Sequence, residues 1–302
     1  YYNSILMNIY DCFMYFDEDM LLDLRLNVLN DHVKKFIISE ATYTHNGSPK
    51  KLNFDINKFR KFKDKIEYII VDKQPSSIFQ LTENENAEER GKKLILNGMA
   101  RDYFQRESLK RGLVETSDDD LILISDLDEI PNLKNLEFSK IKNKIIIFEQ
   151  KMFYYKFNLY YKNFKWFGTK GTKKKNLISP QWVRNIKNKK YPWWRLDVII
   201  SKEKYSKILF VEDGGWHFTC IRTPEDLEKK MLNFAHHYEF EDSGLKVKDL
   251  EKLIKEKKIM YAHNLDKREN KWSGGANLEK IENFQLPDYI KENLNKFHKW
   301  MD

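Results

Sequence analysis

Cysteine, glycine and proline are all scarce in this chain. Its 302 residues include 2 Cys, 11 Gly and 7 Pro. Two cysteines are too few for a disulfide framework, and both lie in apolar surroundings where a buried thiol is expected. No segment rich in Pro, Gly and Ser interrupts the chain, and no internal repeat is present. These absences exclude a fold that depends on oxidation and an array of repeated modules.

Long apolar runs are absent as well. No stretch approaches the roughly 18 to 20 apolar residues that cross a bilayer, and the first residues lack a basic segment followed by an apolar one. We therefore expect no transmembrane segment in this chain. The composition, rich in Lys, Asn and Ile, suggests an AT-rich microbial or viral genome. A cytoplasmic location is accordingly expected.

Negative charge is outnumbered by positive charge, with 46 Asp+Glu against 54 Lys+Arg and a net charge of +8. This balance favours an anionic partner such as nucleic acid, an anionic membrane surface or a nucleotide-sugar. Much of the excess lies on expected helix faces such as Lys246 to Lys258, where a solvated face is the alternative. The 20 Phe, 16 Tyr and 7 Trp exclude a disordered chain.

The first half of the chain alternates apolar strands with helices. Strands are expected at 8–16, 36–38, 66–71 and 121–124, with helices at 18–33, 56–62 and 83–112 between them. This order predicts an α/β fold with a Rossmann-like, mostly parallel central sheet and helices on both faces.

The second half has a different pattern. Lys144 to Tyr161 is rich in Ile, Phe and Tyr, and two further β-rich runs are expected between 192 and 211, which predicts a smaller antiparallel sheet. Loops with Trp166, Trp182, Trp193 and Trp194 suit the faces of sugar rings, with ordinary aromatic core as the alternative. Lys170 to Lys175 is expected to be a mobile basic loop that folds over an anion or stays solvated. Helices are expected from Pro224 onward.

Three acids directly follow the expected strand at 121–124, in the run Ser125-Asp126-Leu127-Asp128-Glu129-Ile130-Pro131. Ligands of open α/β sheets bind at the carboxyl ends of the strands. Alternation along an extended chain places Asp126 and Asp128 on one side, where two carboxylates are unfavourable without a cation. We therefore predict a divalent metal that carries a phosphorylated ligand. The alternative is that one of these acids caps a helix that begins near Pro131.

Four stretches stand out together along the chain. They are Tyr10-Asp11-Cys12-Phe13; Ser39-Glu40-Ala41-Thr42-Tyr43-Thr44 with Gly47, Pro49, Leu52 and Phe54 behind it; the acidic run up to Pro131; and Gly215-Trp216-His217-Phe218 followed by Thr223-Pro224-Glu225. In this order they resemble glycosyltransferase family 17. The resemblance implies a GT-A fold, a nucleotide-sugar donor, Mn²⁺ or Mg²⁺, and inversion at the anomeric carbon. It favours UDP-N-acetylglucosamine as donor and a glycan hydroxyl as acceptor, with no nucleic acid partner.

The resemblance divides one expected domain, 1–302, into three parts. Residues 1–131 form the nucleotide-sugar-binding half, 132–223 the acceptor and metal half, and 224–302 a C-terminal helical part.

Metal binding is expected of Asp126, Asp128 and His217. Asp128 is the first expected ligand, because a bound cation neutralises charge that grows on the departing phosphate. Asp126 is expected to share the ion or to hold the ribose hydroxyls of the donor. A glycine pair precedes His217 and allows close backbone approach, and a neutral imidazole binds such ions; a core histidine is the alternative. The other histidines, including His236 and His237, are expected on helix surfaces.

Donor contacts are expected from Asp11 and Glu40, which follow the first two strands and can accept hydrogen bonds from uracil or ribose. Arg101 is expected to reach the diphosphate or the acids, with a surface salt bridge as the alternative.

Inversion requires a general base that takes the proton of the acceptor hydroxyl. Glu212 and Asp213, beside the glycine pair, and Glu129 are the candidates, and Glu149 stays open.

Two other functions fit parts of the pattern. A phosphoryl or nucleotidyl transferase also uses paired aspartates at a strand end, but a P-loop Gly-Lys signature and a nucleophilic aspartate motif near the first strand are absent. A non-catalytic basic module that binds a polyanion or a glycan would do so in a salt-sensitive manner without a metal.

Overall fold

The computed structural model describes residues 7–134, 136, 138, 141–233, 237–262, 272 and 275–302. In this part of the chain ten strands form one sheet, in the order β3-β2-β1-β4-β7-β6-β9-β5, with β10 beside β7 and β8 beside β6. The strands are β1 (Ile9–Met14), β2 (Lys35–Ala41), β3 (Ile66–Val71), β4 (Leu121–Ile124), β5 (Glu129–Pro131), β6 (Ile145–Tyr154), β7 (Leu159–Lys173), β8 (Ile208–Val211), β9 (Gly215–Thr219) and β10 (Glu279–Lys280).

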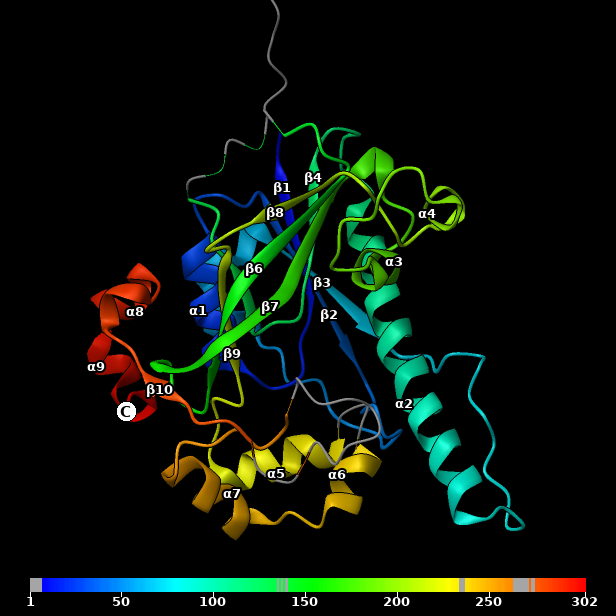
Figure 1. Cartoon of the computed structure of the whole chain (residues 1–302), viewed down its shortest axis with the longest axis vertical. Helices are drawn as coiled ribbons and strands as arrows, with labels where there is room; N and C mark the ends of the chain where they lie inside the picture. The colour runs from blue at the N-terminus through cyan, green and yellow to red at the C-terminus, as the bar shows by residue number, and fades with distance from the viewer. Residues whose placement is uncertain are drawn as a thin grey trace, which may run out of the picture.

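The first four strands are parallel, as the alternation of strands and helices predicts. Side chains that alternate along them enter two cores. Phe13 and Leu123 pack with α1 (Asp19–Leu29), α8 (Asp288–Glu292) and α9 (Leu294–Phe297). Cys12 and Ile124 face the opposite core, with α3 (Pro180–Asn185) and a 3₁₀ turn at Leu109–Leu113 that follows α2 (Ala87–Ser108). Helices therefore cover both faces of this half of the sheet (Figure 1).

The antiparallel strands continue the same sheet, so the prediction of a separate smaller sheet is wrong. Strand β7 pairs antiparallel with β4, from Leu121 opposite Lys173 to Ile124 opposite Lys170. The backbone N–H and C=O groups of a buried strand such as β4 need hydrogen-bond partners on both sides. Strand β1 supplies them on one side and β7 on the other. Lys170 to Lys173 are consequently strand residues, followed by a 3₁₀ turn at Lys174–Asn176, and not a mobile loop.

Between α3 and β8 the structure differs from the sequence expectation. Of the two expected β-rich runs, one is strand β8 and the other is helix α4 (Leu196–Ile200). The amides of Val198 and Ile199 donate to the carbonyl of Arg195 at 3.0 and 3.4 Å, whereas no strand pairs with this segment among the described residues. β-Branched side chains favour a strand only where a neighbouring strand packs against them.

Three helices that follow β9 lie at the carboxyl ends of the parallel strands (Figure 1). They are α5 (Pro224–Asn233), α6 (His237–Ser243) and α7 (Val247–Lys255). His237 is buried, so its expected place on a helix surface is wrong, and His236 lies outside the described residues. No helix in the described ranges is both long enough and apolar enough to cross a bilayer.

Candidate active site

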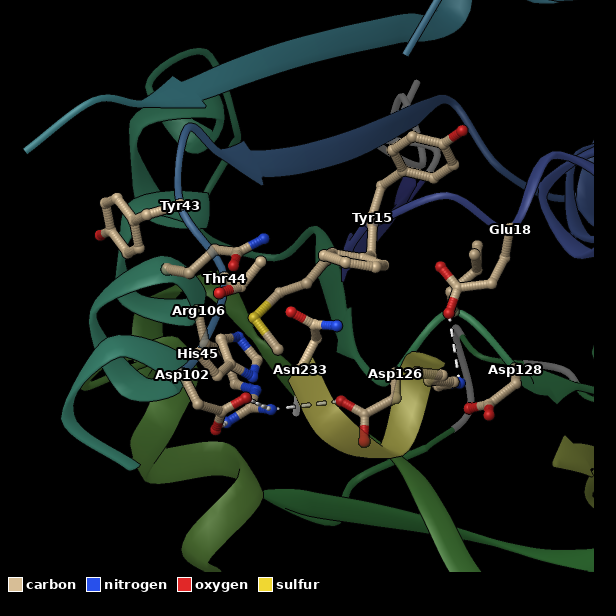
Figure 2. A pocket seen from close by; sticks show the side chains of 15 residues that line it. Tyr15, Glu18, Tyr43, Thr44, His45, Asp102, Arg106, Asp126, Asp128 and Asn233 are labelled. Atoms are coloured by element: carbon tan, nitrogen blue, oxygen red, sulfur yellow. Dashed lines mark hydrogen bonds and ion pairs between the residues drawn. The ribbon is translucent and has the colours of Figure 1, made fainter. Parts of the chain in front are cut away.

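A cavity of about 230 Å³ opens where β1, β2 and β4 end. The chain winds from β1 to β2 and β3 on one side, whereas β4 lies on the other side of β1, so the winding direction reverses here. Such a switch point is where open α/β sheets bind their ligands. Tyr15, Tyr43 and His45 line the cavity together with Asp126 and Asp128 (Figure 2).

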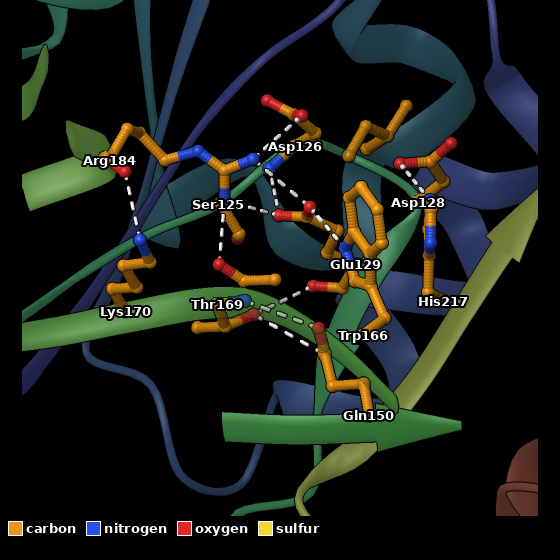
Figure 3. Close-up of polar contacts among 12 residues, drawn as sticks. Ser125, Asp126, Asp128, Glu129, Gln150, Trp166, Thr169, Lys170, Arg184 and His217 are labelled. Carbon is orange, nitrogen blue, oxygen red and sulfur yellow. Dashed lines mark hydrogen bonds and ion pairs between the residues drawn. The ribbon is translucent and has the colours of Figure 1, made fainter. Parts of the chain in front are cut away.

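The acidic run forms a turn and then strand β5. The amide of Glu129 donates to the carbonyl of Asp126 at 3.1 Å, and Glu129 to Pro131 pair with β9. Alternation applies only to an extended chain, so it is this turn, and not a strand, that brings Asp126 and Asp128 to the same cavity. The alternative, a helix that begins near Pro131, is wrong. Asp126 points toward Arg184, and Asp128 points toward His217 (Figure 3).

Arg25 of α1 holds this turn from beneath. Its side chain and that of Asp11 are both 0% exposed, and the guanidinium Nε and Nη2 donate to the two carboxylate oxygens at 2.7 and 2.6 Å. The remaining Nη1 donates to the carbonyls of Asp126, Leu127 and Glu129 at 3.1, 3.2 and 2.8 Å. Asp11, expected at the donor, does not line the cavity and instead neutralises the arginine that shapes it.

Two arginines converge on Asp126. Arg106 of α2 donates to one carboxylate oxygen at 3.2 Å, and Arg184 of α3 donates to the other at 3.0 Å. Although burial alone would raise it, Arg184 and Arg106 hold the pKa of Asp126 well below its usual range. Arg106 also pairs with Asp102, one helical turn earlier, at 2.8 Å. Asp102 and Asp126, which line the cavity, are thus each held in place by an arginine before any ligand binds.

Glu129 is completely buried behind Asp126. Its carboxylate accepts hydrogen bonds from Trp166 Nε1 at 2.7 Å, from Arg184 at 2.7 and 3.0 Å, and from the amide of Asp126 at 2.8 Å. It does not line the cavity. A general base needs access to an acceptor proton, which this placement does not offer; Glu129 fixes Arg184 instead.

His217 and Asp128 form the second polar pair of the site. His217 Nε2 lies 3.6 Å from Asp128 Oδ1, and its ring stacks on Trp166 with centroids 4.6 Å apart. Its other nitrogen, Nδ1, is buried and has no hydrogen-bond partner in the described structure. The glycine pair approaches its neighbours closely, as expected: Gly215 has φ +124°, and a Cβ there would lie 2.2 Å from the carbonyl oxygen of Ile130.

Lys230 and Glu18 line the same cavity beside Asp128. Lys230 Nζ lies 3.2 Å from Glu18, which also pairs with Arg222 at 3.0 Å. Burial opposes ionisation of Glu18, but Lys230 and Arg222 lower its pKa to about 2. Glu18 is therefore a fixed anion at neutral pH.

The residues present fit a divalent cation in a limited way. Ligands around Mg²⁺ lie at 2.0–2.1 Å, so adjacent ones are about 3 Å apart, close to the separation of Asp128 and His217. Asp126, the third expected ligand, is held by two arginines. No group of three His, Cys, Asp or Glu side chains is gathered for a metal among the residues described. The pair fits an ion that completes its shell with substrate oxygens and water.

Two expected donor contacts lie outside the cavity. Glu40 is buried and accepts from Lys50, from the amides of Asn53 and Phe54 and from the hydroxyl of Tyr68. Arg101 donates to Gln74 at 2.8 Å and to the carbonyl of His45 at 3.1 Å, and not to the acids.

Glu212 and Asp213 lie in the turn between β8 and β9, two strands that pair in succession with the long strand β6. Asp213 is 82% exposed, pairs with Lys151 at 3.3 Å and lines a second cavity of about 780 Å³ with Trp216 and Tyr289. Glu149, the open candidate, pairs with Lys165 at 2.6 Å. None of these three acids lines the cavity of Asp126 and Asp128.

The comparison with family models identifies the family. The family model described as Glycosyltransferase family 17 matches residues 3–301. The chain belongs to glycosyltransferase family 17. This family 17 chain is 23% identical, over 303 residues, to the human protein Beta-1,4-mannosyl-glycoprotein 4-beta-N-acetylglucosaminyltransferase. The match covers 93% of the chain and 52% of the human protein, so the chain spans about half the length of this curated relative.

Solved structures show only a distant likeness. HddC from Yersinia pseudotuberculosis is 12% identical with a TM-score of 0.33, and the match covers 69% of this chain and 92% of HddC. HddC complexed with GMP-PN is 14% identical with a TM-score of 0.32, covering 74% and 98%. Likeness at this level carries no argument about the family 17 chain.

Several polar residues at this family 17 site escape sequence reasoning. Arg25 stands among Leu21, Leu22, Leu24 and Leu26, and a basic residue on an apolar helix face is a signal that it is paired in the core. Arg106 follows Asp102 at the i,i+4 spacing. Arg184 and Lys230 give no sequence signal, since each approaches the acids only through the tertiary fold. His45 lines the cavity and is not on a helix surface as expected.

Lys170 makes stability depend on pH in a defined direction. Its ammonium is buried and donates to the carbonyls of Arg184 and Ile186 at 2.9 and 2.5 Å. Burial, together with the Arg184 charge, lowers the pKa of Lys170 to about 7. Above that pH the folded state has lost a proton that the unfolded state keeps up to about pH 10, so stability rises with pH.

We expect the free energy of unfolding of the wild type, minus that of Lys170→Met, to rise by up to about 1.4 kcal/mol per pH unit from about pH 7 to about pH 9. Urea unfolding at several pH values measures this difference, and the subtraction removes the contribution of every other group. A difference that does not change with pH would show that Lys170 keeps its proton in the folded protein.

Proposed function

We propose that this protein is a metal-dependent, inverting glycosyltransferase that moves N-acetylglucosamine from UDP-N-acetylglucosamine to a hydroxyl of a glycan. Membership of family 17 supports the reaction class. The name of the human relative, an N-acetylglucosaminyltransferase, supports the sugar. The acceptor is proposed only as a glycan, because the chain matches about half of that relative.

The observation that carries the proposal is the cavity at the switch point of the sheet, together with the two sets of charges that meet at its lining acids Asp126 and Asp128. Arg106 and Arg184 meet at Asp126, and Asp128 faces His217 and lies beside Lys230. A departing nucleoside diphosphate gains negative charge, and cations fixed in advance around it stabilise that charge. Tyr15 and Tyr43 also line the cavity, where their side chains are proposed to pack beside a base or a ribose (Figure 2).

Asp128 and His217 are the proposed ligands of Mn²⁺ or Mg²⁺. A divalent cation acts here as a Lewis acid toward the phosphate oxygens. The chain's own part is to orient the ligands: Trp166 stacks on His217 and donates to Glu129, and the amide of Phe218 donates to the carbonyl of Asp128 at 2.9 Å. These contacts hold both side chains in place before a donor binds.

Asp126 is proposed to hold the donor's ribose hydroxyls. Its side chain remains 40% exposed, so its oxygens face the cavity although both also accept from arginine. A carboxylate oxygen has more than one acceptor site, so it can bind an arginine and a hydroxyl together.

The test is donor turnover against a panel of UDP- and GDP-sugars, with Mn²⁺, with Mg²⁺ and with EDTA. We expect hydrolysis of UDP-N-acetylglucosamine above all others, its loss in EDTA and its return on addition of Mn²⁺. With a glycan acceptor, proton NMR of the product should show a β-linkage from the α-linked donor. Turnover that is indifferent to EDTA would refute the metal, and a preferred GDP-sugar would refute the donor. If no nucleotide-sugar binds or reacts, the proposal fails.

A further inference from the structure

An exposed apolar surface lies far along the chain from the acids, between α3 and β8. Five side chains form it, and we call them the tryptophan patch: Trp193, Trp194, Leu196, Ile199 and Ile200, which are 74%, 66%, 76%, 69% and 82% exposed. Single exposed apolar residues are ordinary in soluble proteins, but these five lie close together in the chain, and the rings of Trp193 and Trp194 meet edge to face with centroids 6.2 Å apart. Such a group marks an interaction site.

The patch is presented on an ordered base. Helix α4 places Leu196, Ile199 and Ile200 on one face through the i,i+3 and i,i+4 spacing, and Val198 on the buried face. The two ends of the segment are tied together: the amide of Tyr191 donates to the carbonyl of Tyr205 at 3.1 Å, and that of Lys187 to Glu203 at 2.9 Å. Figure 1 shows α4 at the outer edge of the molecule, beyond α3.

The charges around the patch are nearly all positive. Residues 187–207 contain seven Lys or Arg and two acids. Both acids are already paired: Asp197 binds Arg195 at 2.8 Å and Lys204 at 2.7 Å, and Glu203 lies 3.3 Å from Lys187.

Four exposed lysines of this segment have no carboxylate within ion-pair distance in the described structure. They are Lys189, Lys190, Lys202 and Lys207. The segment that carries the patch therefore also carries basic side chains that are available to an anionic partner.

We infer that the tryptophan patch docks this protein onto an anionic lipid surface. Tryptophan prefers the boundary between headgroups and acyl chains, and aliphatic side chains on one helix face enter that boundary beside it. The free lysines meet the anionic headgroups. A second copy of the chain would bring two such positive surfaces together, which disfavours self-association through the patch.

Docking also fixes the acid site relative to the bilayer. Helix α3 carries Arg184 to Asp126 and Glu129 and leads directly into the segment that holds the patch. A membrane that binds α4 would therefore also restrain α3, the helix that carries Arg184.

The experiment is sedimentation with vesicles of phosphatidylcholine alone and of phosphatidylcholine mixed with phosphatidylglycerol. We expect the wild type to bind the anionic vesicles, and added salt to weaken binding. Trp193→Ser/Trp194→Ser should lower the partition coefficient at least about tenfold, because the buried apolar area is lost. Lys189→Gln/Lys190→Gln should lower it by roughly fivefold per charge.

The matched control is Phe284→Ser, which removes an aromatic ring that is 73% exposed elsewhere on the surface and should leave binding unchanged. Circular dichroism and donor hydrolysis should be unchanged in the tryptophan variant, because the replaced rings lie outside the core and the acid site. Absence of wild-type binding to anionic vesicles overturns the inference, as does equal binding by the tryptophan variant. A dimer that dissociates in that variant, without vesicle binding, would assign the patch to a second copy.

Discussion

Asp128→Asn is expected to lower the rate of sugar transfer by about 10²–10³-fold, in line with the removal of one preorganised charged group from a transition-state site. The substitution keeps the volume of the side chain but removes the charge that faces His217 at 3.6 Å and Lys230. If the carboxylate binds the cation, the Mn²⁺ concentration for half-maximal activity should rise as well. Initial rates over a Mn²⁺ titration measure both effects.

The control is Asp213→Asn, which removes the same charge from an 82% exposed side chain beside the second cavity. Its activity should stay within about twofold of the wild type, as is usual for a surface charge far from the chemistry. A large loss in this control would restore Asp213 as the general base. Loss of activity in Asp128→Asn with an unchanged Mn²⁺ requirement would contradict a metal role for Asp128.

Arg25→Met is expected to lower the free energy of unfolding by about 3–5 kcal/mol, because it leaves the buried carboxylate of Asp11 without its counter-charge. It also removes the donor to the carbonyls of Asp126, Leu127 and Glu129, so the acid turn loses its support. The midpoint of thermal unfolding should fall by roughly 6–10 °C, at about 2 °C per kcal/mol for a chain of this length. Differential scanning fluorimetry and urea unfolding measure the two quantities.

Two further variants distinguish the buried pair from a general effect of charge. Lys58→Met breaks the exposed ion pair between Lys58 and Asp19, which lies on α1 as Arg25 does; the two side chains are 54% and 37% exposed. This variant should lower the free energy of unfolding by less than about 1 kcal/mol. The double variant Asp11→Leu/Arg25→Met removes both buried charges and should be more stable than Arg25→Met alone. If the double variant is the less stable of the two, the stranded carboxylate is not the cause.

The strands of the first half are predictable because their signal is local. Leu121–Ile124 and Ile66–Val71 are found with the expected bounds: the first is an uninterrupted apolar run typical of a buried parallel strand, and the second is a short run rich in Ile, Val and Tyr at the edge of the sheet. Leu196–Ile200 has a similar composition but forms a helix, because no strand pairs with it. Composition alone does not distinguish the two cases, since the difference lies in a neighbour elsewhere in the chain.

The sequence predicts the acidic residues of the site but not the arginines and the lysine that pair with them. The acids at 126, 128 and 129 follow a strand end, and His217 follows a glycine pair, so each has a signal in its own segment. Their partners come from α1, α2, α3 and α5, far away in sequence. Expectations for Asp11, Glu40 and Glu129 assumed free carboxylates, whereas the fold gives each of them buried donors.

The sequence by itself determined the family, the order of the parallel strands and helices, and the position of the acidic run at the end of β4. It did so because apolar periodicity and short motifs act over a few residues. Only the tertiary structure decided that β4 and β7 join two halves into one sheet and that Asp126 and Asp128 point to different partners. Only the fold gathered Arg25, Arg106 and Arg184 around the acids. Burial and charge pairing depend on contacts between segments that are distant in sequence, and a pattern within one segment does not specify those contacts.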